Sequence, residues 1–482
     1  MDRRLRCCRI ALVAAFALTG CSSTSAGTSG IRSEFVPALA RANAVSPGNY
    51  IKHVIVIIQE NRSFDNMFEG FPGAETKTFG YQSNGTLTPL RPIDITSSID
   101  PAHGLENALV DYDGGKMDAF DKPPGNPNNP YAPIGSYAYA YIPRSEVAPY
   151  WSLARQYVLA DHMFPSEWGG SFTAHLYLIA GTAELTPTTT EADNPFGTTN
   201  GAWGCDSPSG TATDTWDVEG QEQSNGPFPC FSQFNTMADL LDASGVSWKY
   251  YAPLVSPSGG NPGGFWSSFD AIANVRCGVN GPVTGPCTGT GGDWANVVSP
   301  ETKVLTDITH GKLASVSWVV PDNANSDHPG TGSDTGPSWV ASIVNAVGTS
   351  PYWKSTAIVV LWDDWGGLYD DLPPPQEDYR GLAIRVPCII VSPYAKAHYV
   401  SHTQYEFGSV LKFIEQVFGL PALSTMGKES TYAYGYTDSR ANSLVDSFDF
   451  TQVPRRFTAV QAKYPAVHFL RERPSLKAPD DD

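Results

Sequence analysis

Residues 53–65 read His-Val-Ile-Val-Ile-Ile-Gln-Glu-Asn-Arg-Ser-Phe-Asp, and this stretch decides the fold. Its first part, His53–Ile58, is a nearly unbroken run of β-branched residues. Such a run is typical of a central strand that is buried on both faces of a parallel sheet. The polar residues that follow mark the carboxyl end of that strand. Because ligands in open α/β sheets bind beyond the carboxyl ends of strands, this turn is a candidate part of a functional site.

A second run of the same kind covers Thr356–Trp362 and ends in Asp-Asp-Trp-Gly-Gly at residues 363–367. Two further strands are expected over Ser315–Val320 and Val386–Val391. Helices are expected over Val147–Tyr157, Thr236–Ser244, Trp339–Val347 and Gly408–Phe418. Strands that alternate with helices predict an α/β fold with a mostly parallel central sheet. Gly/Pro-rich insertions, predicted as long loops or a cap, cover residues 71–141, 186–229 and 252–292.

The composition is that of a folded, loop-rich protein. Of the 482 residues, 41% are hydrophobic and 17% are charged, with 45 Gly and 39 Pro. The formal net charge of −18 excludes a protein that wraps nucleic acid, or that docks on anionic membranes by charge alone. No obligate protein partner is evident from the sequence.

The first 20 residues have the pattern of an export signal. Four arginines precede the short apolar run Ile10–Leu18, and Leu-Thr-Gly-Cys at residues 18–21 is typical of a lipobox. Residues 21–48 are expected to be a tether. Lipid attachment at Cys21 would anchor the chain to a membrane, and a plain cleaved signal is the alternative. Both predict an exported protein, either a cell-envelope lipoprotein or a secreted one.

The remaining cysteines suit an oxidising compartment. Cys205 with Cys230, and Cys277 with Cys287, bracket Gly/Pro/Ser-rich loops and are predicted to form disulfides. Cys388 lies inside an apolar run and is expected to be a buried thiol.

The turns after the two central strands carry oxygen ligands. Glu60 and Asn61 follow the first strand, and Asp363 and Asp364 follow the second, so all four are expected at one sheet edge. Hard oxygen ligands of this kind hold a divalent cation, with Ca, Mg, Mn and Zn not distinguished. Alternatively, Asn61 caps the following helix with Glu60 solvated, and the aspartates lie in a solvated loop.

A candidate nucleophile and two candidate acids lie elsewhere in the chain. Ser171 follows Gly169 and Gly170 at the start of a helical run, where backbone amides and the helix dipole favour an anion, although Gly-Gly-Ser is also a common turn. His103 and His328 lie in loops and titrate in the range that suits an ester hydrolase, although most loop histidines are only solvated. The sequence leaves the roles of His162 and His402 undecided.

Several separate blocks resemble, in order, the bacterial phosphoesterase family of phosphatidylcholine-type phospholipases C and acid phosphatases. These blocks are residues 51–65, 114–120, 243–251, 363–375, 381–396 and 399–402. The resemblance covers roughly residues 51–420. It implies an alkaline-phosphatase-like fold, a three-layer α/β/α sandwich, with one catalytic domain over residues 49–427. Residues 428–482 are then expected to be an extension that packs on the same domain.

The resemblance also implies roles for the candidate residues. The family's metal ligands fall on Glu60, Asn61, Asp363 and Asp364, its hydroxyl nucleophile falls on Ser171, and its active-site histidines fall on His103 and His328. The hypothesis is a metal-dependent phosphoric ester hydrolase that forms a phospho-serine intermediate and cleaves phosphodiesters such as phosphatidylcholine. An acid phosphatase acting on monoesters, and an inactive surface-binding lipoprotein, are the alternatives.

The chain departs from the family near the predicted site. It has Asp-Asp-Trp where the family often has Asp-Glu-His, and Thr173-Ala174-His175 where the family has Pro-Asn-Arg. These departures leave the choice of phosphoester substrate open. Trp168 and Trp365 are candidates for aromatic contacts with a choline-like head group, with plain packing as the alternative.

Overall fold

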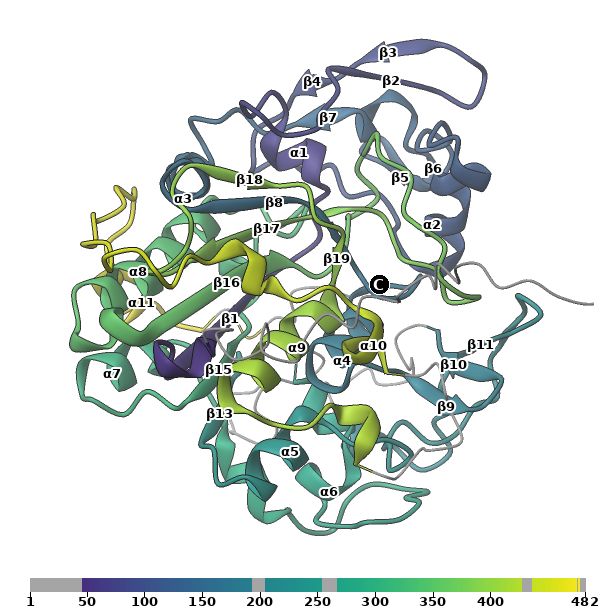
Figure 1. The fold of residues 1–482 in the computed structure, drawn as a ribbon. Coiled ribbons are helices and arrows are strands. Elements are labelled where there is room, and N and C mark those ends of the chain that lie inside the picture. Colours follow the sequence, from purple (N-terminus) through teal and green to yellow (C-terminus); the bar gives the residue numbers. More distant parts are fainter. Residues whose placement is uncertain (1–45, 193–203, 254–266, 427–435, 475, 477–482) are drawn as a thin grey trace, which may run out of the picture. The chain divides into compact units, whose positions relative to one another are not determined.

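A computed structural model describes residues 46–192, 204–253, 267–426, 436–474 and 476 (Figure 1). The predicted export signal, Cys21 and all of the predicted tether except residues 46–48 lie outside the described residues. Among the described residues, every helix is too short or too polar to traverse a bilayer.

One large sheet forms the centre of the described region, in the order β14-β13-β15-β1-β16-β17-β8-β18, and β19 also pairs with β8 (Figure 1). Its strands are β1 (His53–Gln59), β8 (Val158–Phe164), β13 (Trp248–Tyr251), β14 (Val297–Val298), β15 (Val316–Val319), β16 (Thr356–Trp362), β17 (Val386–Val391), β18 (Tyr399–Ser401) and β19 (Tyr405–Glu406). The four strands predicted from apolar runs are β1, β15, β16 and β17. The sequence analysis missed β8 and β13.

The register of the sheet places the ends of β1 and β16 side by side. These strands are parallel neighbours, with His53 opposite Thr356 and Gln59 opposite Trp362, and nearly every residue of both strands is buried. The other pairings of β1, β13, β18 and β19 are also parallel, whereas β17 is antiparallel to both β16 and β8. The prediction of a mostly parallel α/β sheet is therefore confirmed, with β17 as the exception.

Helices cover both faces of the sheet (Figure 1). One group packs around α8 and comprises α3 (Ala148–Gln156), α7 (Lys303–Thr309), α8 (Gly336–Gly348) and α11 (Ala466–Phe469). The other group comprises α4 (Ser171–Ala180), α5 (Met237–Ala243), α9 (Phe407–Phe418) and α10 (Thr437–Arg440). The buried indole of Trp318 on β15 donates a hydrogen bond to the carbonyl of Leu178 on α4, 3.1 Å away, which ties the second group to the sheet. The predicted three-layer arrangement is confirmed.

Shorter elements surround this core. They are α1 (Phe64–Phe68), α2 (Leu105–Tyr112), α6 (Ala273–Arg276), β2 (Phe79–Tyr81), β3 (Leu87–Pro89), β4 (Arg91–Pro92), β5 (Pro124–Asn126), β6 (Asn129–Pro133), β7 (Ala140–Tyr141), β9 (Glu184–Thr186), β10 (Thr189–Glu191), β11 (Thr215–Asp217) and β12 (Glu222–Gln223). Most of them fall in the predicted insertions. In the C-terminal segment, the Thr437 N–H donates to the carbonyl of Gly181, the residue that ends α4.

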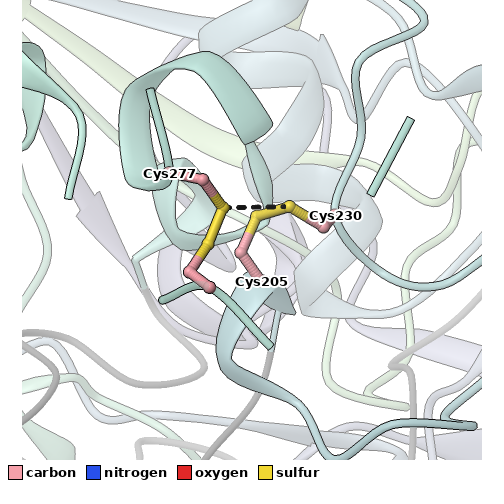
Figure 2. Close-up of side chains that lie close together, drawn as sticks. Cys205, Cys230 and Cys277 are labelled. Atoms are coloured by element: carbon pink, nitrogen blue, oxygen red, sulfur yellow. Dashed lines mark hydrogen bonds between the residues drawn. A yellow bond between two sulfur atoms is a disulfide. The ribbon is translucent and has the colours of Figure 1, made fainter. Parts of the chain in front are cut away.

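Both predicted disulfides are present, and they lie against each other (Figure 2). Cys205 is bonded to Cys230 and Cys277 to Cys287, and the Sγ atoms of Cys230 and Cys277 are 3.6 Å apart. Cys388, on β17, is a buried free thiol, as predicted. Burial raises the pKa of that thiol, so it stays protonated and unreactive.

Candidate active site

The structure brings the turns after β1 and β16 together. The Asn61 N–H donates to Asp363 Oδ1 at 2.9 Å, although more than 300 residues separate these positions in sequence. Glu60, Asn61, Asp363 and Asp364 are all fully buried. Both alternatives from the sequence are therefore wrong: the turns are not solvated, and the cap of α1 is Ser63, whose hydroxyl accepts from the N–H of Asn66.

Glycine allows these two turns to approach so closely. The φ angle of Gly366 is +63°, and a Cβ atom at this position would lie 2.2 Å from the carbonyl oxygen of Asn61. The Gly366 N–H donates to Asp364 Oδ1 at 2.7 Å and so orients that carboxylate. Asn61 itself has a φ of +52°, an uncommon backbone conformation for a residue other than glycine and one that clusters at functional sites.

Ser171 lies beside the two turns, as the first residue of α4. Its hydroxyl donates to Asp364 Oδ2 at 2.9 Å and accepts from Asn61 Nδ2 at 3.0 Å. The same amide nitrogen donates to Asp364 Oδ2 at 3.0 Å and lies 2.8 Å from Nε2 of His103. A buried hydroxyl is thus held between a carboxylate and an amide at the positive end of a helix.

The two predicted histidines face each other near this hydroxyl. The ring centroids of His103 and His328 are 5.6 Å apart, and both side chains are buried. In each ring Nδ1 lies against a backbone carbonyl, that of Pro101 at 2.7 Å and that of Pro329 at 2.6 Å. An Nδ1–H that donates to these carbonyls leaves Nε2 as the ring nitrogen for chemistry.

A buried network supports the loop that carries His328. The preceding residue, Asp327, accepts from the Tyr150 hydroxyl at 2.6 Å and from Gln59 Nε2 at 3.2 Å. Burial raises the pKa of Asp327 to about 6, despite these hydrogen bonds and the nearby Arg62. Since Gln59 is the last residue of β1, the network ties the histidine loop to the same strand end as Glu60.

His175 was missed as a candidate by the sequence analysis. Its Nε2 lies 3.3 Å from Glu60 Oε1 and 3.6 Å from Asp363 Oδ2. The ligand atoms of these three buried residues all lie within 4.8 Å of one another. His175 follows Ser171 by four residues on α4, so both side chains lie on one helix face. That spacing is the signal that could have revealed it.

These residues fit a divalent cation. Two carboxylates that are buried together repel each other unless a cation neutralises them, and their oxygens with an imidazole nitrogen form a usual ligand set. Asp363 Oδ2 is buried and faces Nε2 of His175 at 3.6 Å. Burial alone would raise the pKa of Asp363, but His175 and the neighbouring hydrogen bonds lower it overall, so the carboxylate is the stable form. Glu60, Asp363 and His175 would hold such an ion, while the roles of Asn61 and Asp364 as ligands stay a prediction.

Neither tryptophan considered for a head group is exposed. Trp365 is fully buried, and its indole N–H donates to Asp111 Oδ2 at 2.9 Å. Trp168 is 3% exposed and packs against the ring of Tyr112. The packing interpretation therefore holds for Trp365, whose ring also lies edge-on to His103 and so supports that histidine.

A buried acid just before Ser171 should make stability depend on pH. Burial raises the pKa of Glu167 to about 8, although the hydroxyls of Tyr177 and Thr190 donate to it. Because the folded-state pKa is raised, this group contributes most stability below its unfolded pKa of about 4.5, and that contribution is lost as the pH rises through 8. We expect Glu167→Gln to remove this loss. The variant's free energy of unfolding should exceed that of the wild type by on the order of 4 kcal/mol at pH 9, with a much smaller difference at pH 5.

Urea unfolding at a series of pH values measures this difference. Glu219→Gln, at an exposed position, is the matched control and should show no such pH-dependent gain. A wild-type and a Glu167→Gln curve that stay parallel from pH 5 to pH 9 would contradict the prediction.

The amino-acid sequence is similar to those of known proteins. The sequence profile of a family described as the Phosphoesterase family matches residues 51–421. The non-hemolytic phospholipase C of Pseudomonas aeruginosa is 24% identical over 455 residues, covering 83% of this chain and 59% of that protein. Phospholipase C B of Mycobacterium tuberculosis is 22% identical, covering 84% of this chain and 78% of that protein.

Among solved structures, similarity is weaker. A protein of the alkaline phosphatase superfamily from Vibrio parahaemolyticus aligns over 77% of this chain and 67% of its own, with a TM-score of 0.33 and 10% identity. A score this low does not establish a common fold, so the fold class rests on the sheet and helix layers themselves.

Proposed function

The chain belongs to the Phosphoesterase family, and from this premise we propose that it is a metal-dependent phosphoric ester hydrolase with Ser171 as its nucleophile. The observation that carries the proposal is the position of the Ser171 hydroxyl. It is hydrogen-bonded to Asp364 and Asn61, at the start of α4 and beside the buried carboxylates of Glu60 and Asp363.

The geometry supports an attack by Ser171 on phosphorus. Ser171 Oγ forms a bond to phosphorus while the bond to the leaving ester oxygen breaks. Asp364 Oδ2, 2.9 Å from the hydroxyl, is placed to accept its proton. Water then cleaves the phospho-serine and regenerates the free hydroxyl. The Asn61 amide, which already donates to Ser171, keeps the hydroxyl aligned.

In this proposal, His103 and His328 serve the leaving group. With Nδ1–H of each ring donating to a carbonyl, Nε2 carries a proton only in the imidazolium form, and from that form it can donate the proton to an ester oxygen. The carbonyls of Pro101 and Pro329 fix the ring orientations. Burial of both rings strengthens any charge interaction that they make in the transition state.

The cation that suits the buried carboxylates is a divalent one. The chemistry that it supplies when bound is a lower pKa for the serine hydroxyl and neutralisation of a phosphoryl oxygen. The nitrogen of His175 beside Glu60 and Asp363 favours an ion that accepts imidazole, such as zinc, over calcium, magnesium or manganese. This refines the sequence prediction, in which the four metals were not distinguished.

For the substrate, we propose a phosphodiester of the phospholipid type. Two relatives are named phospholipase C, and this chain spans only 59% of the length of one of them. The proposed attachment of a lipid to Cys21 would keep the enzyme at a membrane surface, where such a substrate lies. Its place in the cell, exported and held at the envelope or secreted, belongs to this proposal too.

Hydrolysis of nitrophenyl phosphorylcholine and of nitrophenyl phosphate, each with and without a chelator, tests the proposal. We expect the diester to be cleaved with a kcat/KM at least about tenfold above that of the monoester, since contacts to the second ester group of a diester would add binding energy in the transition state. Chelator should abolish both activities, and one divalent metal should restore them. Preference for the monoester would indicate an acid phosphatase instead, and no turnover of either with metal present would indicate an inactive binding protein.

A further inference from the structure

The strand β8 is interrupted at Asp161 and His162. On the side of β17 the register shifts between Cys388 and Val386, so that Asp161 and His162 together lie opposite the single residue Pro387. This two-against-one pairing is a β-bulge, and proline has no N–H to offer to the ladder. Bulges change the direction in which side chains point. Here the side chains of Asp161 and His162 both contribute to one cluster of potential ligand atoms.

On its other side β8 pairs with β18 and then with β19, and this pairing is interrupted at the same residues of β8. The pairing of β18 with β8 ends at Ser401 opposite Ala160, and the pairing of β19 begins at Tyr405 opposite Met163. The segment between these two strands carries His402. Figure 1 shows β18 alongside β8 at this side of the sheet. Breaks in both neighbouring strands thus bring His402 over the bulge.

Two histidines and two carboxylates meet at this break. His402 Nδ1 lies 2.9 Å from Asp161 Oδ2, and His162 Nε2 lies 2.7 Å from Glu75 Oε2 and 4.0 Å from Asp161 Oδ1. The ligand atoms of Asp161, His162 and His402 all lie within 4.8 Å of one another. We propose that Asp161, His162 and His402, with Glu75, form a second metal site that binds a divalent transition-metal ion such as zinc.

The ligand set and its spacing suit such an ion. Zinc takes nitrogen and oxygen ligands at about 2.0–2.2 Å in a tetrahedron, which places neighbouring ligand atoms about 3.4 Å apart. The distances of 2.7, 2.9 and 4.0 Å lie on both sides of that value, so small rotations of exposed side chains would close the site. Two imidazoles favour zinc, nickel or copper over calcium and magnesium.

The surroundings of the site provide both access and support. The carboxylate of Asp161 is buried, whereas the His402 side chain is 58% exposed, so an ion can enter from solvent. Behind the site, Arg385 Nη1 donates to the backbone carbonyls of Asp161 and Glu75, each at 3.0 Å. The guanidinium of Arg385 forms ion pairs with Asp370 and with the aspartate that directly follows it in the chain. These two carboxylates offset the positive charge of the guanidinium. Arg385 therefore fixes the backbone of two ligands without repelling a cation.

The proposed ion would tie the outer strands to the body of the sheet. Asp161 and His162 belong to β8, whereas His402 comes from the link between β18 and β19 and Glu75 from the segment after α1. The site uses none of the residues assigned to the reaction. Because its histidines must be neutral to bind metal, its affinity should fall in acid.

A paired-histidine substitution tests the proposal. Full-length protein is stripped with chelator, loaded with zinc chloride and dialysed, and the bound zinc is measured by elemental analysis. The double variant H162N/H402N should retain one zinc ion fewer per chain than the wild type. The matched double variant H310N/H398N replaces two other exposed histidines and should retain as much zinc as the wild type.

Two further measurements keep the result interpretable. When cobalt replaces zinc, the wild type should show a visible absorption band that is weaker in H162N/H402N. Phosphoester hydrolysis by H162N/H402N, measured with the catalytic metal supplied, should equal that of the wild type. H402N alone changes an exposed side chain and leaves the fold intact, and it should weaken binding at this site at least about tenfold. Equal zinc content and equal cobalt spectra in the wild type and H162N/H402N would overturn the proposal and show that these residues form hydrogen-bonded pairs only.

Discussion

Ser171→Ala should lower phosphoester turnover by at least about 10³-fold, because the proposed reaction has no other route to a covalent intermediate. The substitution removes one buried oxygen, the hydrogen bond to Asp364 and the hydrogen bond from Asn61. It leaves the carboxylates of Glu60 and Asp363 in place. Steady-state assay of the two nitrophenyl substrates, together with elemental analysis of bound metal, measures the effect.

The metal content of Ser171→Ala should equal that of the wild type. Ser342→Ala is the matched control, because Ser342 is also a buried serine, on α8, whose hydroxyl donates to the Ser338 carbonyl at 2.8 Å. It should keep full turnover. If Ser171→Ala retained more than about a tenth of the wild-type rate, another group would have to be the nucleophile.

Asp363→Asn should remove both the catalytic cation and the activity. The substitution preserves shape, and the remaining amide oxygen can still accept from the N–H groups of Asn61 and Asp364. It takes away the negative charge that faces His175. We expect loss of the ion at the Glu60–His175–Asp363 cluster and a fall in turnover of at least about 10³-fold, which corresponds to about 4 kcal/mol of transition-state stabilisation.

Elemental analysis and activity measured over a range of added metal test this second prediction. Asp242→Asn is the matched control: Asp242 lies on α5 and accepts from the indole of Trp248 at 2.9 Å. It should change neither metal content nor turnover. Wild-type metal content in Asp363→Asn would exclude Asp363 from the ligand set.

The central strands and the turns after them could be predicted from sequence because several signals agree there. In β1 and β16 a continuous apolar run ends abruptly in charged residues, and the structure has both strands at the expected positions. The strand β8 was missed because Asp161 and His162 break its apolar pattern directly after a helix. The direction of β17 could not be predicted, because a strand buried on both faces has the same composition in either direction.

The candidate site also contains some residues that could be predicted from the sequence and others that could not. Glu60 and Asp363 follow strands and could be placed at one sheet edge from sequence. His175 was missed because a single histidine in an apolar helix is a weak signal, and only its four-residue spacing from Ser171 pointed to the site. Likewise, the contacts of His162 and His402 depend on a bulge and on two breaks in pairing, which are features of the folded sheet and not of local sequence.

The groups proposed to hold the cation and those that would meet the rest of the substrate have different origins in the chain. Glu60 and Asp363 project from two adjacent strands at the centre of the sheet, whose pairing cannot shift without disturbing the whole molecule. His103 instead lies in the long segment between α1 and α2, outside the sheet. Changes elsewhere in that peripheral segment can therefore alter what meets the substrate while His103 and the ion-holding centre persist, so enzymes built on this plan can diversify in what they cleave without changing how they cleave it.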